Sequence, residues 1–131
     1  MRAAIEGAAP AMREAMEATY FDAMVRLTPR YALQGAATVT GWERGGESIP
    51  CAFSRAGRRG RLGRERSGWE GGGNLLDYDA LIFCAPEAEI APGDRVALAR
   101  PGGEELILET VGRPVVYPTH QEIGVRELNI L

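Results

Sequence analysis

Few side chains in this 131-residue sequence have the types and spacing that catalysis or metal binding requires. The one histidine, His120, lies in a loop-like segment, where a lone imidazole is more often structural than catalytic. Asp77 and Asp79 stand two residues apart at the start of a predicted strand, and we expect both to finish a loop, since two carboxylates alone are weak evidence for a metal. Asp94, in "PGDRV", is expected to accept backbone hydrogen bonds within a turn. The sequence therefore predicts no catalytic residue, no metal site and no cofactor.

Two cysteines, Cys51 and Cys84, lie in apolar, strand-like stretches. Two are too few for a disulfide framework, and their spacing is not that of a metal site. We expect buried free thiols in a reducing compartment. The glycine-containing "GRRGRLG" does not lead into a predicted helix, so it does not match a phosphate-binding loop.

One segment stands apart in charge. Residues 54–74, "SRAGRRGRLGRERSGWEGGGN", carry six arginines and two glutamates, for a net charge of +4, together with seven glycines. Residues 75–131 carry ten acids and four arginines (−6), and residues 1–53 six acids and five arginines (−1), which together give the net charge of −3. We name residues 54–74 the arginine loop. A connection longer than about 12–15 residues in a small domain is functional or disordered more often than not.

The arginine loop has two candidate partners, acidic protein surfaces and nucleic-acid phosphates. The alternative, a solvated insert without a partner, stays open. Its glycines favour a long flexible loop in the free chain, and ordering it costs on the order of 1–2 kcal/mol per residue. The residues expected to contact a partner or DNA in a channel are Arg55, Arg58, Arg59, Arg61, Leu62, Arg64, Arg66 and Trp69, with Leu62 and Trp69 as apolar anchors.

The elements that would position this loop begin with a predicted helix over residues 4–27. Apolar residues recur there every three or four positions, Pro10 suits a first turn, and Thr28-Pro29 would end the helix. We therefore expect an N-terminal helical segment, 1–29. The apolar stripe packs either on its own domain or on a neighbouring subunit. The residues expected to dock on a neighbour are Met12, Met16, Tyr20 and Met24.

After Pro29 the apolar period changes from 3.6 to 2, which predicts a β domain over residues 30–131. "AATVTGWERGGESIPCAFS" predicts two strands joined at a "RGGE" turn, and "DYDALIFCA" a central strand. "DRVALAR" and "EELILETV" predict a second hairpin, "GRPVVYPTHQE" an irregular connection, and "IGVRELNI" a final strand. The expected fold is mainly β (α+β), an N-terminal helix followed by a small six- to seven-stranded antiparallel β-barrel.

This order of elements resembles the head–tail joining proteins of long-tailed bacteriophages, especially the lambda type of head completion protein. The resemblance covers about residues 10–128. It rests on Ala37 to Thr40, Gly45-Gly46, Leu81 to Phe83, Gly93-Asp94 and the strands within Val96 to Val111. The arginine loop is richer in arginine than the family pattern, and residues 112–122 also depart from it.

The resemblance implies a non-enzymatic structural protein of the virion neck, assembled in the host cytoplasm. Such proteins are monomers when free and form a ring, usually of six, below the portal after DNA packaging. The ring closes the filled head and offers the tail a docking surface, and a long loop orders within it. The implied partners are other copies of the chain, the portal or an adaptor, tail proteins and packaged DNA, with no membrane and no cofactor. A gene transfer agent uses the same parts.

Three other functions stay open at this point. A tail terminator or adaptor ring would also be a virion protein. A small host β-barrel could bind nucleic acid through the arginine loop. An enzyme has the least support, because nothing in the sequence matches a nucleophile elbow, a P-loop or a dinucleotide fingerprint. No run approaches the ~20 apolar residues of a membrane span.

Overall fold

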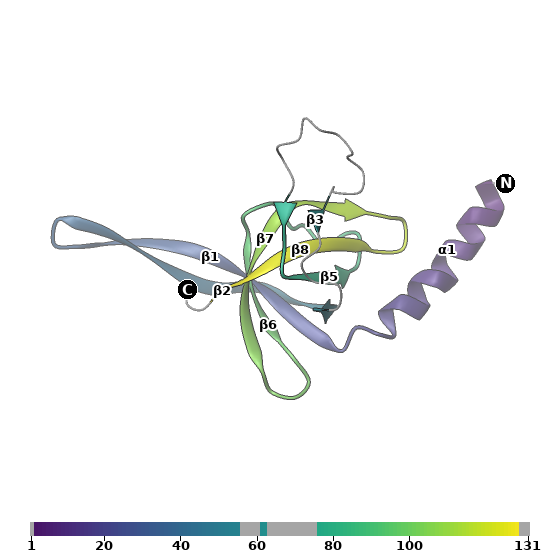
Figure 1. Ribbon diagram of the computed structural model, residues 1–131, viewed down its shortest axis with the longest axis horizontal. Helices are drawn as coiled ribbons and strands as arrows, with labels where there is room; N and C mark the ends of the chain where they lie inside the picture. Colours follow the sequence, from purple (N-terminus) through teal and green to yellow (C-terminus); the bar gives the residue numbers. More distant parts are fainter. Residues whose placement is uncertain (1, 56–60, 63–75, 129–131) are drawn as a thin grey trace.

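The computed structural model describes residues 2–55, 61–62 and 76–128 (Figure 1). One helix comes first and eight strands follow. Their bounds are α1 (Arg2–Glu17), β1 (Asp22–Gln34), β2 (Ala37–Ser54), β3 (Arg61–Leu62), β4 (Leu76–Asp77), β5 (Ala80–Cys84), β6 (Arg95–Ala99), β7 (Glu105–Val116) and β8 (Gln121–Leu128).

Six of these strands close into an antiparallel barrel in the order β1-β2-β5-β8-β7-β6, which confirms the expected fold. Strand β5 pairs with both β2 and β8, so the predicted central strand is confirmed. Strands β6 and β7 form the predicted second hairpin. The short strands β3 and β4 pair with each other in a separate two-stranded sheet.

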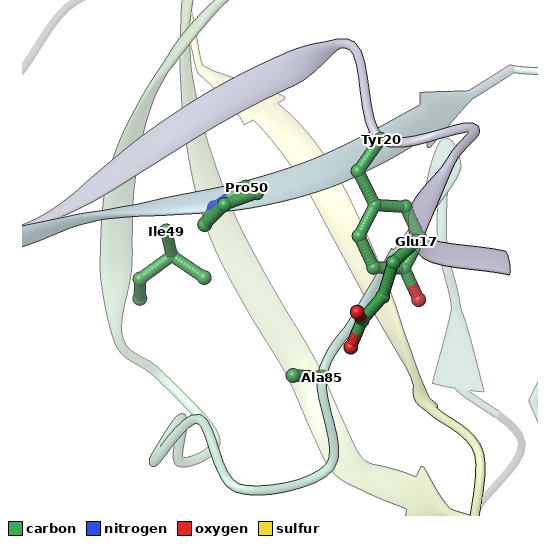
Figure 2. Close-up of a pocket in the computed structure, with 5 residues that line it drawn as sticks. All are labelled: Glu17, Tyr20, Ile49, Pro50 and Ala85. Carbon is green, nitrogen blue, oxygen red and sulfur yellow. The ribbon is translucent and has the colours of Figure 1, made fainter. Parts of the chain in front are cut away.

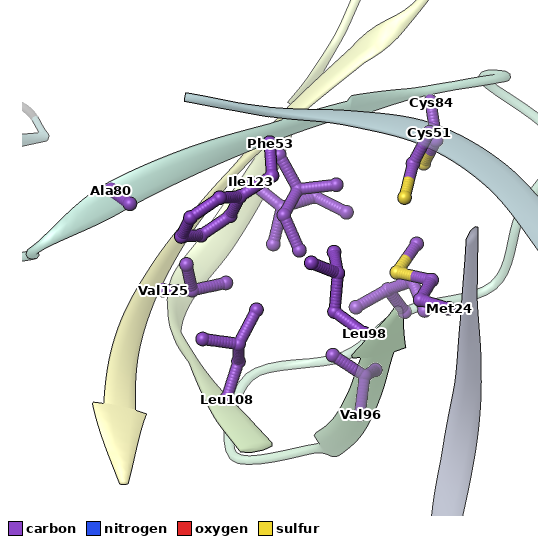
Figure 3. Packing of buried hydrophobic residues seen from close by; sticks show 12 residues of the cluster. Met24, Cys51, Phe53, Ala80, Cys84, Val96, Leu98, Leu108, Ile123 and Val125 are labelled. Atoms are coloured by element: carbon purple, nitrogen blue, oxygen red, sulfur yellow. The ribbon is translucent and has the colours of Figure 1, made fainter. Parts of the chain in front are cut away.

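The barrel interior is filled by alternate residues of its strands, as the period of two requires. Val96, Leu98, Leu108 and Val125 are fully buried, and Phe53 closes one side of the cluster (Figure 3). Cys51 and Cys84 are register partners on β2 and β5, with their sulfur atoms drawn side by side. Both are buried free thiols, as predicted.

The predicted helix over residues 4–27 is wrong at its C-terminal end, because α1 ends at Glu17 and residues 22–34 form β1. The spacing of Met16, Tyr20 and Leu27 fits a helix, but this segment is needed to close the barrel between β2 and β6. As a strand it buries Met24, which is 1% exposed, and it pairs its backbone on two sides. Tertiary packing here outweighs local periodicity, so the boundary at residue 29 is replaced by one after Glu17.

The predicted turn at "RGGE" is also wrong, because β2 is one strand of 18 residues. The register changes from Met24 opposite Ile49 to Arg26 opposite Gly45, which leaves residues 46–48 as a bulge. Gly46 has a φ of 81°, a conformation that glycine adopts without a Cβ penalty. The chain instead reverses at Gly35, whose φ is 66°.

This shift of the turn produces a long projection. The last β1–β6 pair joins Leu27 to Arg95, but the β1–β2 pairing continues from there to Gln34 and Ala37. Residues 28–43 therefore form a two-stranded ribbon that extends away from the barrel, opposite α1 along the long axis of the molecule (Figure 1). We name residues 28–43 the arm.

A third correction concerns residues 112–116, which were expected to be irregular. They belong to β7, which passes a register irregularity between Val111 and Val115 and pairs again with β8. Gly112, with a φ of 69°, lies within this irregularity. The connection between β7 and β8 is therefore only residues 117–120.

Candidate interaction surfaces

The arm presents apolar side chains to solvent. Every residue from 30 to 41 is exposed, and Tyr31 and Leu33 are 69% and 75% exposed. These two side chains share one face of the ribbon with their cross-strand partners Thr40 and Thr38, because alternate residues of a strand point the same way. An isolated two-stranded ribbon is only marginally stable in water. The arm is thus a surface that a partner could stabilise.

The base of the arm is fixed to the barrel. The Arg95 guanidinium lies 4.4 Å from the centre of the Trp42 ring, and Arg44 Nη2 lies 2.9 Å from Glu105 Oε1. The hydrogen bond to Arg44 lowers the pKa of the Glu105 carboxyl. Arg30 and Glu43 pair on the opposite face from Tyr31. These contacts fix the orientation of the arm relative to the barrel. The tip of the arm has no barrel strand beside it among the described elements.

A charged contact joins helix α1 to the barrel. Arg13 donates from Nη1 and Nη2 to the two carboxylate oxygens of Glu87, at 2.8 and 2.5 Å, and from Nε to Glu17 at 2.9 Å. The hydrogen bond to Glu87 raises the pKa of the Arg13 guanidinium, and the same bond lowers the pKa of Glu87. In Figure 1 the rest of the helix points away from the barrel.

A pocket of about 290 Å³ lies where the end of α1 meets the barrel (Figure 2). Tyr20 and Glu17 lie across it from Ile49, with Pro50 between them and Ala85 below. The lining is mostly apolar, with one carboxylate. The Tyr20 hydroxyl is buried without a hydrogen-bond partner among the described residues, and burial raises its pKa.

The four residues predicted to dock on a neighbouring subunit are separated by the structure. Met12 is 58% exposed on α1, and Met16 is half-buried in its last turn. Tyr20 follows the helix and forms a wall of the pocket. Met24 is not on the helix and lies in the barrel core, so it is removed from the candidate set.

Within the arginine loop, the structure describes only residues 54–55 and 61–62. Arg58, Arg59, Arg64, Arg66 and Trp69 lie outside the described residues. The backbone of Arg61 and Leu62 forms β3 and pairs with Leu76–Asp77. The remaining loop residue, Arg55, is bound to the barrel.

Arg55 donates from Nε and Nη2 to the Glu127 carboxylate at 2.8 and 3.2 Å, and its guanidinium lies 5.2 Å from the centre of the Phe53 ring. The hydrogen bond to Glu127 raises the Arg55 pKa. Arg55 therefore anchors the start of the loop to β8.

The residues considered for catalysis have structural partners. His120 is half-buried, with Nδ1 2.8 Å from Thr119 Oγ1 and Nε2 3.1 Å from Glu122 Oε2, and its ring stacks on Tyr117 at 4.8 Å. These contacts hold the imidazole between the β7–β8 turn, which contains Tyr117 and Thr119, and Glu122 near the start of β8. Among the described residues, no group of three or more His, Cys, Asp or Glu side chains could hold a metal ion.

The two described candidate aspartates behave as expected. Asp79 Oδ2 accepts a hydrogen bond from the Glu127 backbone N–H at 3.0 Å, and Asp94 Oδ2 accepts one from the Ala91 N–H at 2.9 Å. Both confirm the prediction of polar residues that complete loops and turns. The expectation that Asp77 finishes a loop is wrong, because its backbone lies in β4 and pairs with Arg61; its side chain is outside the described set.

Sequence reasoning missed the buried polar residues, of which Asp22 and Gln121 make the longest-range contacts. Asp22, 6% exposed, accepts a hydrogen bond from the Phe53 N–H at 2.8 Å and one from Arg100 Nε at 3.2 Å. Gln121, 2% exposed, donates from Nε2 to the carbonyl oxygens of Ala85 and Ala88 at 2.9 and 2.8 Å. Gln121 thus fixes the β5–β6 connection, which carries Glu87 and the floor of the pocket.

The thiols of Cys51 and Cys84 are protonated and unreactive at neutral pH. Burial raises the pKa of each to about 12, and for Cys51 the charge of Asp22 adds to the effect. A thiol is nucleophilic as its thiolate. At neutral pH both side chains therefore act as small apolar residues of the core.

Comparison of the chain with family models, with curated proteins and with solved structures finds no match. In the part of the chain that the structure describes, no helix has the length and apolar character to cross a bilayer.

Proposed function

We propose that this protein is a structural neck component of a tailed phage or gene transfer agent, which forms a ring between the DNA-filled head and the tail. One observation carries the proposal. The exposed large apolar side chains of the described residues lie on α1, at Phe21, on the arm, and at or just after the end of β7, outside the buried core cluster of the barrel. Such surfaces suit contacts with neighbouring proteins.

The order of elements supports the same function. A helix, a six-stranded barrel and a long loop between its second and third barrel strands occur together here. This is the arrangement that the resemblance to head completion proteins implies. In this function the barrel is the rigid body of the subunit, and α1 and the arm are available to its neighbours.

The first experiment removes the gene from a phage or transfer agent that encodes it. We expect DNA-filled heads and separate tails, counted by negative-stain electron microscopy, and we expect purified protein to restore joining when added to the extract. Normal joined particles without the chain would contradict the proposal. A defect confined to the tails would instead favour a tail terminator.

The arginine loop gives a second experiment on the same function. We expect replacement of Arg58, Arg59, Arg61 and Arg64 with Ser to leave the melting temperature almost unchanged, since an exposed ion pair contributes only about 0–1 kcal/mol. The same variant should impair head–tail joining or retention of packaged DNA. Normal complementation would show that the loop is a solvated insert. Salt-dependent DNA binding by the free wild-type protein would favour the nucleic-acid-binding function.

A further inference from the structure

Among the residues whose side chains the structure describes, the exposed large apolar residues fall into two groups. The first group lies on the arm and consists of Tyr31, Leu33 and Val39. The second consists of Met12 on α1, Phe21 after it, and Val116 and Tyr117 at the end of β7. We name the second group, together with the pocket, the helix-side surface.

The elements that carry the helix-side surface are linked by contacts. Arg13 ties α1 to Glu87 in the β5–β6 connection, and Gln121, at the end of the β7–β8 turn, binds the same connection through Ala85 and Ala88. In Figure 1 α1 and the β7–β8 turn lie on one side of the barrel, and the arm extends to the other.

Two unlike apolar surfaces on opposite sides of one chain have a consequence for self-association. A two-fold dimer that pairs arm with arm, or helix-side surface with helix-side surface, would leave the other surface of each subunit exposed. Contact between the arm of one copy and the helix-side surface of the next would cover both. Repeated contacts of this head-to-tail kind close into a ring or continue as a filament.

The two surfaces also fit in size and chemistry. The pocket, at about 290 Å³, is near the lower limit of about 300 Å³ for small-molecule sites and suits a few side chains better than a cofactor. Its apolar walls match Tyr31 and Leu33. The Thr38 and Thr40 hydroxyl groups on the same arm face can donate hydrogen bonds, and the Glu17 carboxylate at the pocket can accept them.

We propose that the arm of one copy docks on the helix-side surface of a second copy, with Tyr31 and Leu33 beside the pocket formed by Tyr20, Ile49 and Pro50. The inference rests on the proposed function because it supplies the subunit contact of the neck ring. It assigns the contact to folded, described parts of the chain and not to the arginine loop.

The experiment is disulfide trapping between two different variants. Leu33→Cys places a thiol on the arm, and Glu17→Cys places one at the pocket. Arg126→Cys, exposed on β8, is the matched control. Background from Cys51 and Cys84 is small, because both are buried with raised pKa values. Full-length proteins are mixed pairwise, oxidised with dissolved oxygen and copper–phenanthroline, and analysed by non-reducing gel and peptide mass spectrometry.

We expect the mixture of Leu33→Cys and Glu17→Cys chains to give at least about tenfold more mixed dimer than the mixture of Leu33→Cys and Arg126→Cys chains. Even transient docking of chains that are mainly monomeric when free raises the effective thiol concentration, and oxidation traps the docked pair. Equal yields in the two mixtures would overturn the inference. A predominance of Leu33→Cys homodimers would also overturn it, since that product requires arm-to-arm contact.

A chain carrying both Leu33→Cys and Glu17→Cys extends the test. We expect a ladder of multimers that ends at one closed species. An endless ladder would contradict a ring, and with it the proposed function, while leaving the arm contact in place. Conversely, loss of head–tail joining on removal of the gene, together with equal trapping yields, would retain the neck function and reject the arm contact.

Discussion

The barrel and the arm are built from the same two strands but differ in what surrounds them. Within the barrel, β2 has β1 on one side and β5 on the other, and Cys51 and Phe53 are buried. In the arm, the same strand pairs only with β1 among the described elements, and Val39 is 40% exposed. Alternation of apolar and polar residues gives a strand in both the barrel and the arm, but only the barrel has a core in which the apolar side chains are buried. The arm's apolar residues therefore do not stabilise the monomer by burial.

We expect the largest difference in unfolding free energy between substitutions at two leucines, one in the barrel and one in the arm. Leu98→Ala removes a fully buried side chain from the barrel, which should lower the free energy of unfolding by about 2–5 kcal/mol. Leu33→Ala removes an exposed arm side chain and should change it by no more than about 0.5 kcal/mol. Urea denaturation followed by circular dichroism measures both. Similar losses at the two positions would show that the arm is packed within the monomer.

The next comparison is between the unfolding free energies of variants at two glutamines, one buried in the barrel and one at the arm tip. Gln121→Leu leaves the Ala85 and Ala88 carbonyl groups without their side-chain donor, so we expect a loss of about 1–3 kcal/mol in unfolding free energy. Gln34→Leu, at the exposed arm tip, should stay within about 0.5 kcal/mol of wild type. An equally small effect of Gln121→Leu would mean that the β5–β6 connection is held by other contacts.

The third prediction tests whether the barrel interior excludes water from the two cysteine thiols. The folded thiols of Cys51 and Cys84 have pKa values of about 12, raised from an ordinary value of 9.0, so the folded state keeps its protons where the unfolded state loses them. Their contribution to stability is complete below pH 9 and is lost as the pH rises toward 12, at no more than about 1.4 kcal/mol per pH unit for each thiol.

The measurement is the slope of unfolding free energy against pH between 9 and 11. We expect a steeper fall for wild type than for a chain with Cys51→Ala and Cys84→Ala. Parallel slopes would show that both thiols titrate normally and that water reaches them in the native protein.

The smallest effect is expected at the tether of α1. Glu87→Gln weakens the contact with Arg13, so we expect faster amide exchange in the last turns of the helix with little change in global stability. Glu89→Gln is the matched control, an exposed carboxylate two residues away. The Glu87 pKa is lowered by Arg13, so the contact is complete above the ordinary pKa and is lost as the pH falls through the lowered value. Unchanged exchange in Glu87→Gln would show that the helix is held elsewhere.

The sequence predicted the barrel because its signals are local. Cys51, Phe53 and Ile82 alternate with more exposed residues, and the turn at Gly93 carries the glycine that its φ of 85° favours. The buried cysteines followed from the same alternation. These features depend on neighbours within one strand or one turn, which is the range over which pattern reasoning is reliable.

The errors came from positions where distant contacts decide the structure. Met24 fits the helical spacing, but it is buried because β1 must close the barrel. Gly45-Gly46 is a plausible turn, but pairing with β1 makes it a bulge. That second error concealed the arm, because a turn at Gly46 would have left no strand long enough to extend beyond the barrel. Gln121 carried no signal, since its partners are carbonyl groups more than thirty residues away.

The most direct test is an electron cryo-microscopy map of the head–tail junction in particles that encode this chain. The account predicts a ring of copies between head and tail, with each arm lying on the helix-side surface of the next copy and Leu33 close to Tyr20 of that copy. A junction without this chain would contradict the proposed function. A ring whose arms point into solvent or toward each other would contradict the subunit contact.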